Sequence, residues 1–204
     1  MTPTLLTHGN GPVLVLAHGA GAPMDSPFMD AISASLVTHK IKVVRFEFPS
    51  MHQRRVDGKK RGPNPTRILE AHFIDVLSQF KGPVFIGGKS MGGRMASHIA
   101  DQVAAAGLLC LGYPFHPPGR PEKLRTAHLA ELKTPTLILH GERDPFGKPD
   151  EVREYTLSPS ISIEWIPDGD HSFKPRKSSG RTLDENLCLA AHKMAAFIHN
   201  LSPK

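Results

Sequence analysis

The chain has 204 residues, of which 39% are hydrophobic and 22% charged, and its formal net charge is +6. This composition is typical of a globular protein and excludes a largely disordered chain, and a length of this order allows one core that buries about 70% of the unfolded surface. Only two cysteines are present, which excludes a disulfide framework and a cysteine-ligated metal site. We therefore expect a single domain over residues 1–204.

Short apolar runs alternate with helical patterns along the chain. The runs are mostly continuous, as is typical of strands covered on both faces in a parallel sheet. Ser26-Pro27 and Asn64-Pro65 favour helix starts, and Thr182 with Glu185 forms a capping box. In chain order, the expected elements are a strand at 13–17, a helix at 27–37, a strand at 42–48, a helix from 65 to at least 77, a strand at 83–86, a helix at 91–100, strands at 107–111, 135–139 and 162–166, and a helix that reaches 201.

This order predicts an α/β fold in which helices cover both faces of a mostly parallel sheet of about six or seven strands. Ligands of such sheets bind at the carboxyl ends of the strands. The longest connections without a clear pattern are residues 52–64 and 112–134, and neither is long enough for a second domain. No apolar run approaches the roughly 20 residues that cross a bilayer, and no signal peptide is evident. We expect no membrane span and a cytoplasmic location.

Residues 84–94, with the sequence VFIGGKSMGGR, fit two motifs that exclude one another. A phosphate-binding loop would need a glycine five residues before Gly88, where Pro83 stands instead. The G-x-S-x-G motif of a nucleophile elbow fits in spacing and in context, because Ser90 follows an apolar strand and precedes a helical pattern. The two flanking glycines leave room for such a tight turn. The sequence therefore favours Ser90 as a catalytic nucleophile over a nucleotide-binding loop.

A nucleophilic serine needs a general base and a carboxylate that orients the base. With this elbow, the acid and then the histidine follow the serine along the chain. Asp144 comes after the strand at 135–139, within HGERDPFG, and His171 comes after the strand at 162–166, within PDGDHSF. We expect these two residues to complete a triad with Ser90. Glu142 is the nearest competitor for the acid. The rivals of His171 as the base are the other histidines near predicted loops: His18, His116, His128 and His140.

The attacked carbonyl oxygen needs two hydrogen-bond donors. We expect the backbone N–H of Met91, which follows the nucleophile, and that of Ala20, in the segment AHGAGAP, to form this oxyanion hole. His18 is expected to prop the same turn rather than to act as a base. No H-E-x-x-H or comparable metal-ligand spacing occurs, so we expect no metal and no cofactor.

Two basic residues flank the nucleophile in sequence, and each could contact substrate or support the structure. Arg94 lies four residues after Ser90, on the same helix face, where an ion pair with a neighbouring carboxylate is the expected role and a contact with a substrate anion the alternative. Lys89 could serve as a substitute base, but its place at a strand end is expected to direct it away from the Ser90 hydroxyl.

Five segments, HGAGAP, GGKSMGGRMAS, GYPFHPPGRPEKLR, LHGERDPFG and GDHSF, together resemble small α/β-hydrolase-fold proteins that have no lid domain. The likeness is to the testis-expressed protein thirty group and, more distantly, to dienelactone-hydrolase-like enzymes. It covers nearly the whole chain and implies the same triad and oxyanion hole, but it implies no substrate. Unlike larger members, the chain is expected to lack an N-terminal strand pair and a lid.

These observations predict a serine hydrolase that acts on carboxylic ester or thioester bonds through an acyl-enzyme. The alternative is a weakly catalytic or non-catalytic scaffold that docks an acidic partner through three basic segments, 52–62, 119–125 and 174–181. The same segments could steer an anionic small-molecule or acyl substrate toward the site. With 6% aromatic residues and no binding motif, a nucleic-acid partner is not expected. The sequence gives no basis for an oligomeric state.

Overall fold

A seven-stranded sheet forms the centre of the computed structural model, which describes residues 4–202. The strands lie in the order β1-β3-β2-β4-β5-β6-β7, and only β1 is antiparallel to its neighbour. Their bounds are β1 (Leu5–His8), β2 (Val13–Ala17), β3 (Lys42–Phe46), β4 (Phe85–Lys89), β5 (Gly107–Leu111), β6 (Thr136–Gly141) and β7 (Ile161–Ile166). The predicted α/β class, with a mostly parallel sheet, is confirmed.

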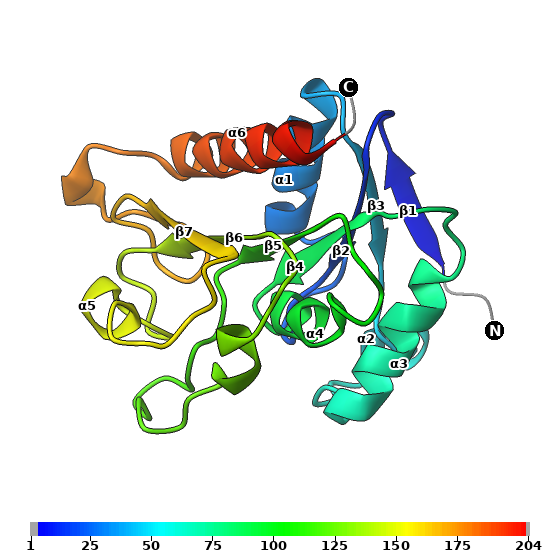
Figure 1. Ribbon diagram of the computed structural model, residues 1–204, viewed down its shortest axis with the longest axis horizontal. Helices are drawn as coiled ribbons and strands as arrows, with labels where there is room; N and C mark the ends of the chain where they lie inside the picture. Colours follow the sequence, from blue (N-terminus) through cyan, green and yellow to red (C-terminus); the bar gives the residue numbers. More distant parts are fainter. Residues whose placement is uncertain (1–3, 203–204) are drawn as a thin grey trace.

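Helices cover both faces of the sheet (Figure 1). Helices α1 and α6 pack against each other on one face, and α3 and α4 do so on the other. The helix bounds are α1 (Pro27–Thr38), α2 (Pro49–Asp57), α3 (Thr66–Leu77), α4 (Met91–Ile99), α5 (Pro149–Val152) and α6 (Leu183–Leu201), with short 3-10 helices η1 (Ala127–Ala130) and η2 (Lys177–Ser179). No helix within the described range is long and apolar enough to cross a membrane.

The apolar runs are continuous because each strand contributes to two cores. Along β2, Leu14 and Leu16 pack with α1 and α6, whereas Val15 and Ala17 pack with α3 and α4. Since successive side chains of a strand point to opposite faces, a strand with helices on both sides needs apolar residues at every position. This requirement explains why the inner strands were visible in the sequence.

Two elements differ from the prediction. β1 is an N-terminal strand that pairs with β3 at the sheet edge, so the expected lack of an N-terminal strand pair is wrong in part. It has four residues and is only partly buried, which leaves little pattern to detect. Helix α2 begins at Pro49 and ends before Gly58, which has the left-handed conformation, so it covers the first part of the connection expected at 52–64. Only Met51 of this helix is buried, so it has no apolar stripe.

The end of β4 also differs, and the difference affects the site. This strand was expected at 83–86 but continues through Gly87 and Gly88 to Lys89, and each of its residues is buried. Glycine is uncommon inside strands, so the sequence did not indicate that the strand continues through Gly87 and Gly88. A Cβ at position 87 would lie 2.1 Å from the Leu109 backbone oxygen of β5, so the glycine allows close strand contact.

Candidate functional site

The carboxyl ends of β2 and β4 meet at the point where the strand order reverses. From β2 the chain crosses to β3 on one side, and it returns to add β4 on the other side. Such a switch point leaves a crevice between the loops that follow the two strands, and ligands of open α/β sheets bind there. The segment after β2 holds Gly19 and Ala20, and the segment after β4 holds Ser90.

Ser90 stands between β4 and α4 with φ 51° and ψ −114°, a region that few residues other than glycine adopt. Small neighbours make this turn possible. A Cβ on Gly88 or on Gly92 would lie 2.5 Å from the Ala17 backbone oxygen, far inside van der Waals contact. The turn leaves the serine partly exposed at the first turn of α4, where backbone N–H groups favour negative charge.

Asp144 and His171 lie close together above the sheet. The Nδ1 atom of His171 is 2.7 Å from Oδ2 of Asp144, whose side chain is fully buried. The other carboxylate oxygen, Oδ1, accepts a hydrogen bond from the Phe146 N–H. Burial alone would raise the pKa of Asp144, but the hydrogen bond and charge of the neighbouring histidines lower it overall. The carboxylate is therefore ionised at neutral pH and can orient the imidazole.

A second histidine, His140, lies behind this carboxylate, and its contact with Asp144 was not predicted. Its Nε2 atom is 3.5 Å from Asp144 Oδ2 and 2.9 Å from the Gly147 carbonyl oxygen, which can only accept. The Nε2–H therefore donates to Gly147. Burial lowers the pKa of His140 to about 4, so the ring is neutral at pH 7. The sequence marks His140 only as a histidine near a predicted loop, which does not reveal its contact with Asp144.

The competing acid Glu142 takes a different role. Its Oε2 atom accepts the Asp168 N–H at 2.7 Å, so it helps to hold the turn after β7. Within residues 4–202, His171 has a hydrogen bond to Asp144 and none to Glu142.

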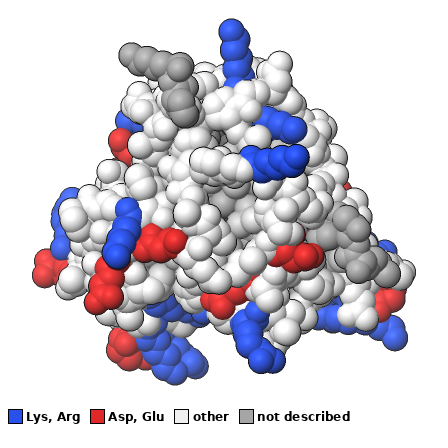
Figure 2. Space-filling view, turned by 45° about the vertical axis from the view of Figure 1, so that its right-hand side comes forward, with Lys and Arg blue, Asp and Glu red and all other residues white. Residues whose placement is uncertain are grey.

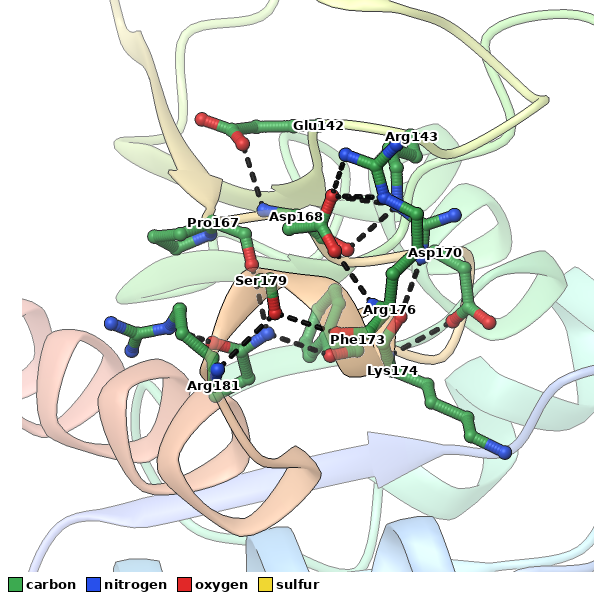
Figure 3. A network of polar contacts seen from close by, with 11 residues as sticks. Glu142, Arg143, Pro167, Asp168, Asp170, Phe173, Lys174, Arg176, Ser179 and Arg181 are labelled. Atoms are coloured by element: carbon green, nitrogen blue, oxygen red, sulfur yellow. Dashed lines mark hydrogen bonds and ion pairs between the residues drawn. The ribbon is translucent and has the colours of Figure 1, made fainter.

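The loop that carries His171 is held by a dense polar network (Figure 3). Asp168 has φ +49°, and its carboxylate accepts the Arg176 N–H at 2.6 Å and pairs with the side chains of Arg176 and Arg143. Asp170 accepts the N–H groups of residues 172 and 174. These bonds connect the residues before His171 to those after it, and so they fix the position of His171 relative to the sheet.

His18 forms hydrogen bonds that join the turn after β2 to the backbone at Phe48. Its Nε2 accepts the Phe48 N–H at 3.0 Å, so the hydrogen is on Nδ1, which donates to the Gly19 carbonyl at 2.6 Å. Burial lowers the pKa of His18 and keeps it neutral. Within the described part of the chain, the N–H groups of Ala20 and Met91 donate none of the backbone hydrogen bonds found in turns and loops. Ala20 lines the cavity beside Ser90, and Met91 does not.

Ser90 and His171 line one cavity of about 340 Å³. No hydrogen bond joins their side chains among the described residues, as is common in active sites without ligand. The Phe146 ring lies 4.3 Å from the imidazole, centre to centre. The remaining lining residues are mostly small or apolar: Gly19, Ala20, Gly21, Ala22, Ser26, Phe28, Met29, Lys89, Phe146 and Ser172.

The two basic residues that flank Ser90 lie differently. Lys89 lines this cavity and its Nζ donates to the His171 carbonyl oxygen at 2.6 Å. Arg94 does not line it, and the ion pair expected for Arg94 is absent from the part of the chain that the structure describes, where its Nε is buried without a partner. Phe28 and Phe146 were not predicted, because a sequence pattern does not show which loop side chains turn inward.

A family profile described as an alpha/beta hydrolase domain matches residues 10–199 of the chain. The chain belongs to the alpha/beta hydrolase family. In residues 4–202 of this hydrolase domain, no group of three or more His, Cys, Asp and Glu side chains could hold a metal ion.

Solved structures with the same fold lie far from this alpha/beta hydrolase in sequence. A monoacylglycerol lipase from Paleococcus ferrophilus is 13% identical, with a TM-score of 0.72 over 99% of this chain and 100% of the lipase. A serine hydrolase without lid from Xanthomonas campestris is 17% identical, with a TM-score of 0.66 over 93% and 88% of the two chains. A serine hydrolase homologue from Coxiella burnetii is 19% identical, with a TM-score of 0.67 over 93% and 90%. At these identities the likeness concerns the fold.

Proposed function

We propose that this alpha/beta hydrolase cleaves carboxylic ester or thioester bonds, with Ser90 as nucleophile, His171 as general base and Asp144 as the acid that orients it. The observation that carries the proposal is the 2.7 Å contact between His171 and the buried Asp144, beside a serine in a strained elbow that lines the same cavity. An imidazole with one nitrogen fixed by a carboxylate presents the other to take a hydroxyl proton.

The reaction would proceed in two halves. Nε2 of His171 takes the proton as Ser90 Oγ attacks the carbonyl carbon, and the N–H groups of Ala20 and Met91 stabilise the oxyanion. His171 then gives the proton to the leaving alcohol or thiol, and an acyl group remains on Ser90. Water, deprotonated by the same imidazole, releases the acid and restores the serine.

The substrate class rests on the chemistry of the site and on its neighbours. The cavity of about 340 Å³ is near the small end of ligand pockets, which supports a small acyl or small-molecule substrate. The monoacylglycerol lipase and serine hydrolase names of the similar folds support ester cleavage. We also keep as proposals the membership of the testis-expressed protein thirty branch and a cytoplasmic location, which cell fractionation would test.

The alternative function is a scaffold that docks an acidic partner. It has less support, because basic residues of the segments that would bind this partner are paired with acidic ones. In the basic segment 52–62, Arg55 pairs with Glu47 and Asp25, and Arg61 pairs with Asp57. Pairing reduces the net field of such a segment. On the face in Figure 2, Lys and Arg side chains are interspersed with Asp and Glu and form no large patch of one sign.

Labelling with a fluorophosphonate probe tests the proposed function, because such probes react with activated serines. We expect labelling of the wild type, none in Ser90→Ala and a strong decrease in His171→Ala. Ser172→Ala is the matched control, since Ser172 lines the same cavity but has no place in the triad, and it should be labelled like the wild type. A folded wild type that resists the probe would contradict the proposal and favour the scaffold.

A further inference from the structure

Lys89 is a buried cation beside the proposed nucleophile that the triad does not use. Its side chain is 9% exposed, although lysine is almost never buried without a partner. Of its three N–H donors, one binds the His171 carbonyl oxygen. The Phe28 ring lies 5.4 Å from Nζ, measured to its centre. No carboxylate of residues 4–202 lies within ion-pair distance of this ammonium.

The acidic groups nearest to Lys89, Asp144 and Asp170, form hydrogen bonds with other residues. Asp144 is bound to His171 and to a backbone N–H, and one oxygen of Asp170 accepts two N–H groups of its own loop. They favour the ammonium only at longer range, and burial outweighs them, which lowers the pKa of Lys89 to about 8. At pH 7 the site still holds mostly ammonium, a desolvated charge that lacks a counter-ion.

Lys89 contributes to the cavity that holds the proposed nucleophile. It lines this cavity with Ser90 and His171, and much of the other lining is apolar, with Phe28, Met29 and Phe146. Position 112 is a glycine with φ +64°, and a Cβ there would lie 3.0 Å from Nζ. In a mostly apolar pocket, one charged group fixes the orientation of the ligand.

We propose that Lys89 binds a carboxylate of the substrate, so that the preferred substrates are esters or thioesters that carry one ionised carboxylate. This inference rests on the proposed function and names the substrate class of the same site. The carboxylate belongs either to the acyl group, as in a half-ester of a dicarboxylic acid, or to the leaving alcohol. A role of Lys89 confined to bracing the His171 carbonyl would use one of its three donors and would give no preference for charge.

The test compares pairs of esters that differ in charge and little in shape. For the acyl side, phenyl hemisuccinate is paired with phenyl succinamate; for the alcohol side, para-acetoxybenzoate is paired with para-acetoxybenzamide. The rate of spontaneous hydrolysis is measured without enzyme and subtracted in each case, because the free carboxylate of phenyl hemisuccinate attacks its own ester. We expect the wild type to prefer the carboxylate in one pair by on the order of 10- to 100-fold, the value of a charge-assisted hydrogen bond.

In Lys89→Met this preference should fall to near unity, whatever happens to the absolute rates. Lys177→Met, which removes an exposed charge of the basic segment after β7, should keep it and so separates a local contact from general steering. Equal kcat/KM within both pairs in the wild type, or an undiminished preference in Lys89→Met, would overturn the proposal.

If Lys89→Met does not fold, a competition experiment on the wild type alone still tests the proposed carboxylate site. Succinate should slow fluorophosphonate labelling of Ser90 at constant ionic strength, and succinamide should not. Equal effects of the two would overturn the carboxylate site while leaving the serine hydrolase intact. Absence of labelling would instead be a failure of the proposed function.

Discussion

Ser90 keeps its unusual backbone conformation because the residues around it are small. Gly88 and Gly92 lie against the same backbone oxygen of β2, so the elbow is packed directly against the end of this strand. The spacing of these residues was visible in the sequence, as was the place of Asp144 and His171 after later strands. The inward turn of Lys89, Phe28 and Phe146 was not, because it depends on tertiary packing rather than on local pattern.

A side chain at position 88 should therefore destabilise the fold. Gly88→Ala would place a methyl group 2.5 Å from the Ala17 oxygen, and we expect a loss on the order of 1–3 kcal/mol in the free energy of unfolding, as for other overpacked sites. Urea unfolding measures it. Gly62→Ala is the control, since a Cβ there meets nothing within 4 Å; equal stability of the two variants would contradict this account.

The carboxylate of Asp144 should matter far more than that of Glu142. Asp144→Asn replaces an acceptor with a group that can donate to His171, which favours the wrong tautomer, and kcat should fall on the order of 10³- to 10⁴-fold. Glu142→Gln keeps an oxygen that can accept the Asp168 N–H and should leave kcat close to that of the wild type. A similar loss in both, measured with one neutral ester, would show that the acid is misassigned.

The segment between β7 and α6 acts as a rigid support rather than a loose loop. Its order comes from Asp168, Asp170 and Arg143, which bind backbone groups on both sides of His171 (Figure 3). The sequence did not show that Arg143, on the loop after β6, reaches across to the same turn, since that contact joins residues far apart in the chain.

Loss of the Asp168 charge should loosen this segment. Asparagine accepts the left-handed conformation found at position 168, so Asp168→Asn removes charge without backbone strain. We expect faster hydrogen exchange at residues 169–175 and a lower kcat, because His171 is less well fixed. Asp150→Asn is the control, as that side chain is 93% exposed and its one ion-pair partner among residues 4–202 is Arg153. Unchanged exchange in Asp168→Asn would refute the supporting role.

The fold as a whole brings the proposed triad together from three separate strand ends. The alternation of strands and helices predicted a parallel sheet and placed Ser90, Asp144 and His171 at one edge. The strand order, which puts β4 next to β2 at the switch point, did not follow from the sequence, because pairing of strands is decided by long-range packing. Burial of the Lys89 ammonium lowers the free energy of unfolding of the whole domain.

Because of this burial, the stability of the protein should rise with pH in the alkaline range. The pKa of Lys89 is about 8 in the folded protein against an ordinary 10.5, so the unfolded chain binds more protons between these values and stability rises with pH there. Relative to Lys89→Met, the wild type should gain on the order of 2–3 kcal/mol from pH 8 to 10.5. Lys177 is exposed, so the difference in the free energy of unfolding between wild type and Lys177→Met should not change over this pH range. Parallel curves for all three proteins would disprove the burial of this charge.

The most direct test of the central claim is the capture of an acyl-enzyme on Ser90. Wild type mixed with para-nitrophenyl acetate should release a rapid burst of para-nitrophenol, and mass spectrometry after an acid quench should find about one acetyl group per chain, on the peptide that contains Ser90. Hydrolysis that continues in Ser90→Ala, or turnover by the wild type with acetyl found on another residue or on none, would contradict a serine hydrolase built on Ser90, His171 and Asp144.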